Sequence, residues 1–438
     1  MNIKSKIACF FLLFLMFGAS GASAQKLWTL EQCVDTALVN NRNVRQQQLS
    51  YKSKEIAYRQ SKHDLLPDLN GSVGQNFGFG RSLTAENNYV NSNSKTTSFG
   101  VGTSLTLFDG MKMKRNIEEK EAELKASGAD LEKVEKDIIL NVSTVFLQVL
   151  QNKELLKNAE TQLAITRENI DRTKELIKSG KLAEGEIYEL LAQEAKEELS
   201  RVQADNNLKL SLLDLAQVMN LEDYSSLDVA VPENLFQNEL SVLSATEVYQ
   251  SALQNRPEIK SVQYRLQSSE KNVDIAKSGY YPRLTFGANW GTGYYNMSNV
   301  PANASFGSQF KNNMQTGVSL NLSIPIFNKF QVRSQVQTAQ LDVENSKIEM
   351  DKTKLDLRKN IEQAYYNAIA ARNRWDSAQK SVKASEESYR FASQKFEAGK
   401  ANQYEANQAK TNLTQAISEQ TQAKYEYAFR LKILELMK

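Results

Sequence analysis

The stretch LTFGANWGTGYYNMSNVPANASFGSQFKNNMQTGVSLNLSI, residues 284–324, decides the fold. It predicts two strands around a polar loop, because apolar and small or polar side chains alternate through its first and last parts. The even positions of 284–294 are Leu, Phe, Ala, Trp, Thr and Tyr, and those of 314–324 are Met, Thr, Val, Leu, Leu and Ile. Each strand therefore has one apolar face, and each reaches the roughly 9–11 residues that a tilted strand needs to cross a bilayer.

The same alternation occurs once more, earlier in the chain. The four candidate membrane strands are about 68–80, 97–108, 283–295 and 313–326. The alternative is a soluble sandwich, in which the apolar faces of the strands pack on each other. Two features favour the membrane: the opposite face carries Gly, Ser and Asn rather than charge, and the sequence offers no second set of strands.

Long helices are predicted for most of the remaining chain, which has only 6 prolines in 438 residues. The longest cover about 111–179 and 330–398, and each is followed by a glycine that suits a helix C-terminus. Return helices follow over about 184–219 and 403–436. Apolar residues recur every seven positions, which predicts coiled-coil packing. They include Ile117, Leu124, Leu131 and Ile138, then Val142, Val149, Leu156, Leu163 and Ile170, and Val336, Val343, Met350 and Leu357 in the second long helix.

The chain is predicted to consist of two structural repeats, each with the order helix, strand, strand, long helix, helix. Leu66-Pro67 matches Tyr281-Pro282 at an offset of 215, and Phe108-Asp109 matches Phe327-Asn328 at an offset of 219. We expect the first repeat over 25–220, a connector over 221–256 and the second repeat over 257–438. The fold class is therefore mainly α with a transmembrane β-barrel.

Residues 1–24 are predicted to be a secretion signal. Lys4 and Lys6 precede an apolar run, residues 7–17, that is too short to span a bilayer as a helix. Ala22-Ser23-Ala24 fits a signal peptidase site, so we expect cleavage after Ala24; a retained membrane anchor is the alternative. Of the two cysteines, Cys9 leaves with the signal and Cys33 stands alone, which excludes a disulfide framework.

The composition argues against several classes of function. The 54 Lys and Arg residues nearly balance 51 Asp and Glu residues, so no basic excess suggests nucleic-acid binding. His63 is the single histidine and has no second metal ligand nearby in the sequence. The Gly-x-Gly sequences lie within or at the ends of strands rather than before helices, so they are not phosphate loops. We expect no enzyme, no metal and no cofactor.

The strand count predicts an oligomer. Four strands cannot close a barrel, and an open strand edge is not viable in lipid. Two chains would supply 8 strands and three chains 12. A polar, glycine-rich inner face suits the larger barrel with a water-filled lumen.

The chain resembles the TolC-like family of outer membrane efflux proteins. The resemblance rests on the order, spacing and duplication of motifs across nearly all of the mature sequence. The motifs are Leu30-Glu31, Ala37-Leu38, Asn40-Asn41, Leu66-Pro67, Leu107-Phe108-Asp109-Gly110, Ile324-Pro325-Ile326-Phe327-Asn328 and the tip glycines Gly180 and Gly399. The resemblance implies a trimer with a 12-stranded barrel in the outer membrane of a Gram-negative bacterium, on a long periplasmic α-helical barrel. It also implies the exit duct of an efflux pump or a type I secretion system, with a periplasmic adaptor and an inner-membrane transporter as partners.

The resemblance also implies where the pore narrows. In the family, acidic side chains near the helix tips ring the periplasmic entrance, and the positions that match are Glu405, Gln408 and Glu186. Gln408 is an amide where the family has an acid, and Ala401 and Phe396 replace an Arg and a Tyr of the entrance latch. An acid in the first turn of a helix, favoured by the helix dipole, is the alternative for Glu186 and Glu405. The expected adaptor-docking tips are Gly180, Lys181, Gly399 and Lys400.

Two other classes compete with an exit duct. A trimeric surface adhesin also combines coiled coil with four strands per chain, but it has its strands at the C-terminus and not at two internal positions. A periplasmic coiled-coil adaptor has one helical hairpin and soluble β domains, and it lacks amphipathic membrane strands.

Overall fold

The computed structural model describes residues 27–83, 87–222, 224, 227–232, 244–298 and 304–437. The secretion signal expected in 1–24 lies outside them. Among the described helices, none combines the length and the hydropathy that crossing a membrane requires.

The chain folds into two compact units, and each is built from both sequence repeats. The first unit consists of the described residues within Met1–Gln46, Lys133–Leu253 and Leu357–Lys438, and the second of those within Gln47–Glu132 and Gln254–Asp356. The helices α4 (Lys112–Lys178) and α9 (Gln331–Glu397) each contribute to both units. They have 67 residues each and are the long helices predicted over 111–179 and 330–398.

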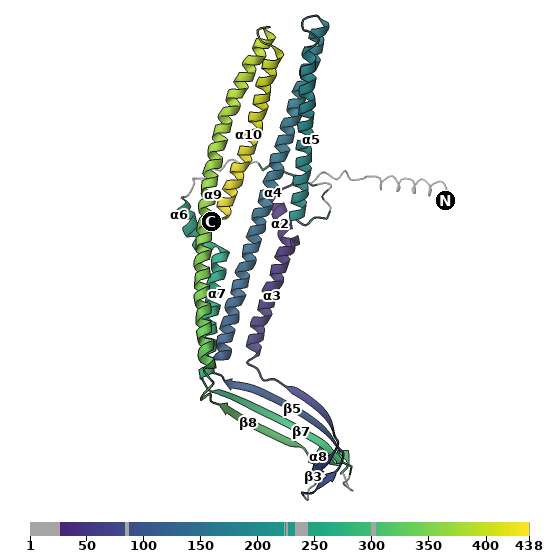
Figure 1. Ribbon diagram of the computed structural model, residues 1–438, viewed down its shortest axis with the longest axis vertical. Coiled ribbons are helices and arrows are strands. Elements are labelled where there is room, and N and C mark those ends of the chain that lie inside the picture. Colours follow the sequence, from purple (N-terminus) through teal and green to yellow (C-terminus); the bar gives the residue numbers. More distant parts are fainter. Residues whose placement is uncertain are drawn as a thin grey trace, which may run out of the picture. The chain divides into compact units, whose positions relative to one another are not determined.

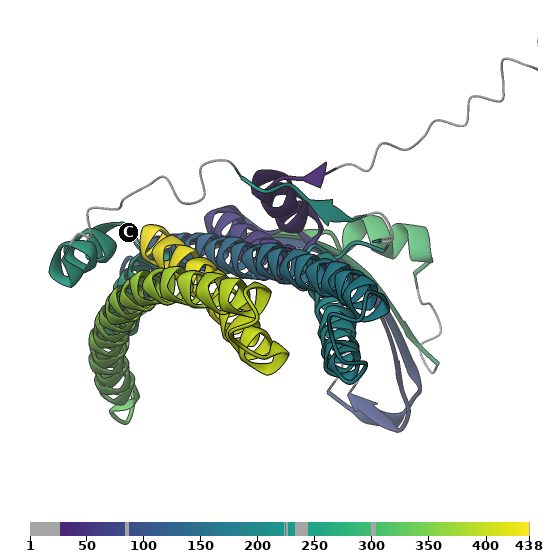
Figure 2. The same ribbon diagram turned by 90° about the horizontal axis from the view of Figure 1, so that it is seen from above.

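The first unit consists mainly of two helical hairpins. The return helix α5 (Glu186–Val218) lies beside the later part of α4, and α10 (Gln403–Leu436) lies beside the later part of α9 (Figures 1 and 2). Ion pairs join the members of each hairpin: Arg167 lies 2.9 Å from Glu194, and Arg374 lies 2.6 Å from Glu426. The unit also contains α2 (Leu30–Asn40), most of α6 (Ala245–Asn255) and the parallel two-residue strands β1 (Leu27–Trp28) and β6 (Asp228–Val229).

The core of the first unit follows the predicted seven-residue pattern. Val142 and Val149 of α4 are fully buried, and Leu163 and Ile170 are 3% exposed. Many of the buried side chains of α9 and α10 are alanines, and two of them, Ala364 and Ala368, pack with Leu434. Small side chains let two helices approach closely over their whole length.

The second unit consists of helices and a four-stranded sheet that is connected to them at one end. Most of α3 (Arg42–His63), α7 (Pro257–Lys277), the 3₁₀ turn η1 (Ser278–Tyr280) and the earlier parts of α4 and α9 belong to it. Lys54 of α3 lies 3.0 Å from Glu123 of α4, and Arg265 of α7 lies 2.6 Å from Asp130 of α4.

The sheet is antiparallel, with the strand order β2-β5-β7-β8. The strands are β2 (Asn70–Gly78), β5 (Ser94–Phe108), β7 (Arg283–Met297) and β8 (Gln315–Ser323), which confirms the four predicted strands. The central pair joins the two repeats, and each repeat contributes one edge strand. The loops predicted as polar carry short elements: β3 (Arg81–Leu83) pairs with β4 (Tyr89–Asn91), and α8 (Phe306–Asn312) precedes β8.

The register gives the sheet two unlike faces. Val101 lies opposite Trp290, and Phe286 lies opposite Leu320, so the apolar side chains share one face. The other face sets glycine opposite serine or asparagine, as in Gly74–Ser98, Gly287–Ser319 and Gly317–Asn289. A Cβ on Gly317 would lie 2.7 Å from Oδ1 of Asn289, so a larger residue there would require the Asn289 amide to move.

The turn from sheet to long helix is the same in both repeats. Gly110 and Met111 have φ of 70° and 67°, and Lys329 and Phe330, at the offset of 219, have φ of 53° and 62°. The two turns differ, however, in whether their first residue must be a glycine. A Cβ on Gly110 would lie 2.7 Å from Cβ of Tyr281 and 2.9 Å from the carbonyl oxygen of Ser278, so only glycine fits there.

The substitution Gly110→Ala should destabilise the protein by more than the ~1–2 kcal/mol that a left-handed backbone costs an L-residue, because the new methyl group also meets Tyr281 and Ser278. Lys329→Ala is the matched control, since residue 329 already carries a Cβ at positive φ. Thermal unfolding of the protein in detergent measures both. Equal melting temperatures for the two variants would contradict this account of Gly110.

Candidate functional site

The candidate site has two parts, and each lies within one unit. Among the described residues, the sheet of the second unit has a largely exposed apolar face and two edge strands without a further neighbour. The tips of the helical hairpins in the first unit carry the residues expected at a pore entrance.

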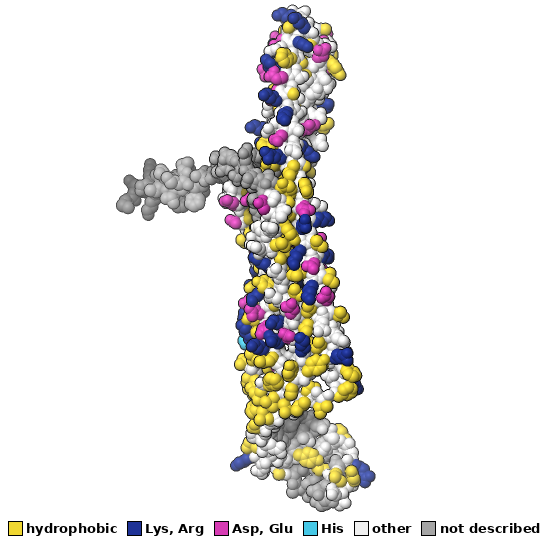
Figure 3. Space-filling view, turned by 90° about the vertical axis from the view of Figure 1, so that its left-hand side faces the viewer, with side chains coloured by type: hydrophobic (Ala, Val, Ile, Leu, Met, Phe, Trp, Pro, Cys, Tyr) yellow, Lys and Arg dark blue, Asp and Glu magenta, His cyan; other side chains and the backbone are white. Residues whose placement is uncertain are grey.

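The apolar face of the sheet is open to the surroundings of the single chain except near the loops, where Phe306 and Phe310 of α8 pack on Phe99 of β5. Figure 3 shows hydrophobic side chains gathered at the lower end of the drawn face, where charged side chains are few. The most exposed apolar side chains of the strands are Val73 (73%), Val318 (70%), Leu320 (67%) and Leu322 (57%). Among the described residues, the other β pairs have only two or three residues per strand, so no second sheet of comparable size covers this face. This argues against the soluble sandwich.

Among the described residues, the free edges belong to β2 and β8, and both strands have nine residues. By contrast, the part of β7 that extends beyond β8 is closed by side chains. The Gln309 amide accepts from the backbone N–H of Tyr295 at 2.9 Å and donates to its carbonyl oxygen at 2.8 Å. Asn313 Nδ2 donates to the carbonyl oxygen of Gly293 at 2.7 Å. The edges left for a further strand are therefore those of β2 and β8.

The two hairpin tips have the same backbone structure. Gly180 and Gly399 have φ of 69° and 68°, and each ends its long helix in a Schellman motif. The N–H of Lys181 donates to the carbonyl of Leu176 at 2.9 Å, and that of Gly180 donates to the carbonyl of Ile177 at 2.9 Å. The equivalent bonds at the second tip, Lys400 to Lys395 and Gly399 to Phe396, are 2.8 and 2.9 Å. Gly180, Lys181, Gly399 and Lys400 are all exposed.

The expected entrance residues lie just past these tips. Asn402 caps α10 by accepting from the N–H of Glu405 at 3.0 Å, and Glu405 is exposed in the first turn. Gln408 is exposed one turn further on and donates to Asn412 at 3.2 Å. Glu186 is the first residue of α5 and is half-buried. Within the described part of the chain, no side chain forms a hydrogen bond or ion pair with the Glu405 carboxylate, so its charge is available to solvent.

A cavity of about 360 Å³ lies between the two hairpins near their tips. Tyr389 and Phe396 of α9, Leu176 of α4, and Gln403 and Asn407 of α10 are among its lining residues. Phe396, where the family latch has a Tyr, is half-buried in this wall. Burial raises the pKa of Tyr389, which keeps its hydroxyl neutral.

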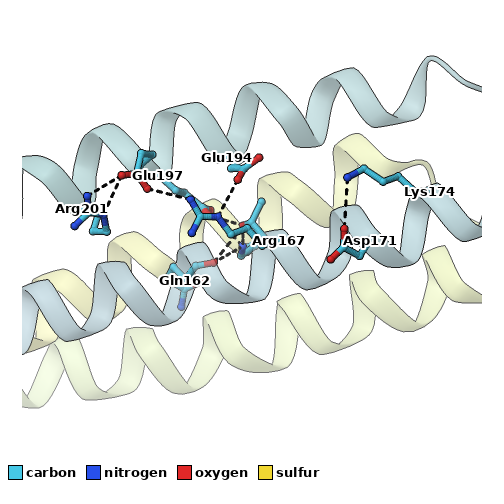
Figure 4. Close-up of polar contacts among 10 residues, drawn as sticks. Gln162, Arg167, Asp171, Lys174, Glu194, Glu197 and Arg201 are labelled. Carbon is cyan, nitrogen blue, oxygen red and sulfur yellow. Dashed lines mark hydrogen bonds and ion pairs between the residues drawn. The ribbon is translucent and has the colours of Figure 1, made fainter.

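Sequence reasoning missed a buried polar network at the inner end of this cavity. Lys410 of α10 lies 3.2 Å from the Glu197 carboxylate of α5 and donates to the carbonyl oxygen of Gln162 of α4 at 3.2 Å. Thr166 of α4 hydrogen-bonds to both Lys410 and Glu197. Figure 4 shows Glu197 and Gln162 on their two helices, with Arg167 and Glu194 paired beside them. The placement of Lys410 among Ala406, Ala409 and Ala416 was the signal in the sequence, because those alanines mark the buried side of α10.

Long paired helices and a short sheet with a largely exposed apolar face are the parts that a channel protein of the outer membrane needs. The chain belongs to the outer membrane efflux protein family, whose model matches residues 33–221 and 248–436. The two matched segments begin 215 residues apart, which is the offset of Leu66-Pro67 from Tyr281-Pro282. The protein is thus an outer membrane exit channel of the efflux and secretion type, as its resemblance implied.

Individual relatives agree with this assignment. The chain is 24% identical over 361 residues to toxin and drug export protein A of Aggregatibacter actinomycetemcomitans, which covers 80% of this chain and 73% of that protein. It is 21% identical over 412 residues to the outer membrane protein TolC of Escherichia coli, covering 93% and 81%.

Solved structures show the same fold. The Campylobacter jejuni CmeC outer membrane channel matches with a TM-score of 0.77 at 19% identity, covering 93% of this chain and 85% of that one. A membrane protein from Pseudomonas aeruginosa matches with a TM-score of 0.78 at 17% identity, covering 94% and 93%.

The substitution Gly399→Ala should loosen the second tip, because φ of 68° strains a residue with a Cβ by ~1–2 kcal/mol although the space around it is open. We expect faster hydrogen exchange at the amides of residues 399 and 400, whose bonds form the Schellman motif. Gly185→Ala is the control, since Gly185 has φ of −63° and equally open space. Unchanged exchange in the Gly399 variant would show that the motif does not hold the tip.

Proposed function

We propose that three copies of this chain join their sheets into one 12-stranded barrel that crosses the outer membrane. The single observation that carries the proposal is a four-stranded sheet with an exposed apolar face and two unpaired edges of equal length. Lipid satisfies the apolar face, but only another strand satisfies the backbone groups of β2 and β8. Pairing β8 of one copy with β2 of the next gives a head-to-tail contact, which closes into a ring.

Exposed apolar stripes on the helices support the same contact between neighbouring copies. Leu341, Ile348 and Leu355 of α9 are seven residues apart and 60–70% exposed. Leu49 and Ile56 of α3 are also seven apart and are 55% and 64% exposed. Since α3 leads into edge strand β2 and α9 follows edge strand β8, both stripes lie on elements joined to the free edges. Seven-residue apolar stripes are the surfaces that coiled-coil partners cover.

The inner face of the sheet favours three copies over two. Gly, Ser and Asn fill it, so a barrel of 12 strands leaves room for water, whereas an 8-stranded barrel is filled by its side chains. The helical hairpins would continue the duct as a periplasmic α-helical barrel. Cargo, either small molecules or proteins, would then pass from a periplasmic adaptor and an inner-membrane transporter to the exterior.

We place the adaptor at the exposed tips, Gly180 with Lys181 and Gly399 with Lys400, and the narrowest part of the pore at Glu405, Gln408 and Glu186. The identical Schellman motifs would offer an adaptor six equivalent tips in a trimer. The alternative role, a trimeric coiled-coil adhesin or structural protein, fits the strand positions less well, because both strand pairs here are internal to the chain. The family consists of channels and not of enzymes, and we propose no catalytic role.

Light scattering in detergent should give three chains per particle for the wild-type protein. Leu341→Glu should shift the particles toward single chains, because it adds a charge to the exposed apolar stripe of α9 that a neighbouring copy would bury. Gln340→Glu adds the same charge at the next exposed position and should leave the trimer intact. Two chains per particle would point to an 8-stranded barrel, and a stable wild-type monomer would overturn the barrel altogether.

Glu405 should make the pore selective for cations. Three carboxylates around a narrow aperture attract cations and repel anions. In planar bilayers with a salt gradient, Glu405→Gln should weaken the selectivity, and Glu405→Lys should reverse or abolish it. Glu186→Gln is the comparison and should change the reversal potential less, because Glu186 is half-buried on the neighbouring helix. A reversal potential that Glu405→Lys leaves unchanged would place Glu405 away from the entrance.

A further inference from the structure

The network of Lys410, Glu197 and Thr166 is a charged contact sealed inside a bundle. The side chains of Lys410 and Glu197 are 4% and 8% exposed. Three helices meet there: Lys410 comes from α10, Glu197 from α5, and Thr166 with the Gln162 carbonyl from α4. Gln193 of α5 also donates to Glu197 at 2.8 Å. The network therefore ties the second hairpin to both helices of the first.

Stability alone does not explain why charges are buried there. Removing a lysine and a carboxylate from water costs several kcal/mol, and apolar pairs of similar volume are often as stable or more stable. Burial lowers the pKa of Lys410 even though Glu197 opposes the shift, so the site disfavours the charge it holds. What a hydrogen-bonded charge pair provides and an apolar pair does not is a single register of the helices that share it.

On the tip side of Lys410 the two hairpins leave a cavity between them. The cavity of about 360 Å³ lies there, and Nδ2 of Asn407, one turn before Lys410, is buried without a hydrogen-bond partner. Nearer the tips, Arg172 and Glu397 form an ion pair at 3.0 Å, but their side chains are 65% and 49% exposed. Exposed pairs of this kind contribute little to stability, because water screens them. Beyond Lys410, the tip of α9–α10 is joined to the first hairpin across the cavity by the Tyr389–Asn169 hydrogen bond and this exposed ion pair.

We propose that Lys410 is the positioning residue of the pore entrance. Its bonds to Glu197, Thr166 and Gln162 fix the start of α10, which carries Glu405 and Gln408 within two turns of Lys410. The segment beyond it moves about this point when the entrance widens. The inference rests on the proposed function, because it assigns a regulation to the entrance formed by Glu405.

The variant Lys410→Met tests this in planar bilayers. We expect a several-fold rise in single-channel conductance and more frequent transitions between conductance levels, because α10 loses its anchor. The preference for cations should persist, since Glu405 remains. Glu405→Gln should give the opposite pattern, with weaker selectivity and no comparable rise in conductance.

A double variant, Lys410→Met with Glu197→Met, separates positioning from stability. Lys410→Met alone leaves Glu197 buried without its cation and should lower the melting temperature, whereas the double variant removes both charges and should restore it. Its conductance should nevertheless stay raised, because two methionines fix no register. If the single variant does not assemble, the double variant carries the test.

Lys424→Met is the matched control. Lys424 also joins α10 to α4, through Glu154 at 3.2 Å, but this pair is about 30% exposed and lies further from the tip. Its conductance should equal that of the wild type. Wild-type conductance in both Lys410 variants would overturn the positioning role while leaving the channel itself intact. Absence of any pore in the wild-type protein would instead overturn the proposed function, and the positioning role with it.

Discussion

The rest of this structure depends on the requirement that every backbone N–H and C=O of a strand in lipid has a partner. The chain meets it internally at two places where one strand extends beyond its neighbour. Gln309 and Asn313 close β7 beyond the end of β8, and Asp68 accepts from the N–H of Ser104 at 2.6 Å where β5 extends beyond β2. The remaining open edges are two strands of nine residues each. Matching lengths are what two copies need in order to pair along the whole edge.

The helices solve a different problem, since they must pack closely and still keep a defined register. Apolar burial gives the packing: Val142, Val149 and a row of alanines along α9 and α10 form seams that run the length of the hairpins. Such seams tolerate sliding by one heptad, because every heptad offers a similar surface. A single charged residue, Lys410, cannot slide in this way, since its partners on α4 and α5 occur at one level only. The close packing of the helices and their register thus come from different residues.

The parts of the fold that could be predicted are those that depend on local sequence patterns. Alternation gave all four strands, and the scarcity of proline with the tip glycines bounded α4 and α9 to within a residue. The parts that could not be predicted depend on distant residues. Lys410 looks like a surface lysine because its partners Glu197 and Thr166 are 213 and 244 positions away. The helix α8 lies in a segment that was predicted to be a polar loop. The side-chain amides of Gln309, within α8, and Asn313, just after it, bond to the backbone of β7 in place of a neighbouring strand. The positive φ of Lys329 could not be predicted from the residue itself. It is explained by Gly110, which occupies the equivalent position of the first repeat.

The pairing of β5 with β7 has a consequence for how the protein is made. Ser94 pairs with Met297 and Phe108 with Leu284, so the centre of the sheet cannot form until most of the chain has been synthesised and exported. One repeat alone has a two-stranded hairpin, which is marginal in water. The helical hairpins are local and can form early, whereas the strands must wait with their apolar faces uncovered. Protection of those apolar faces until the sheet has formed is therefore a requirement of its assembly.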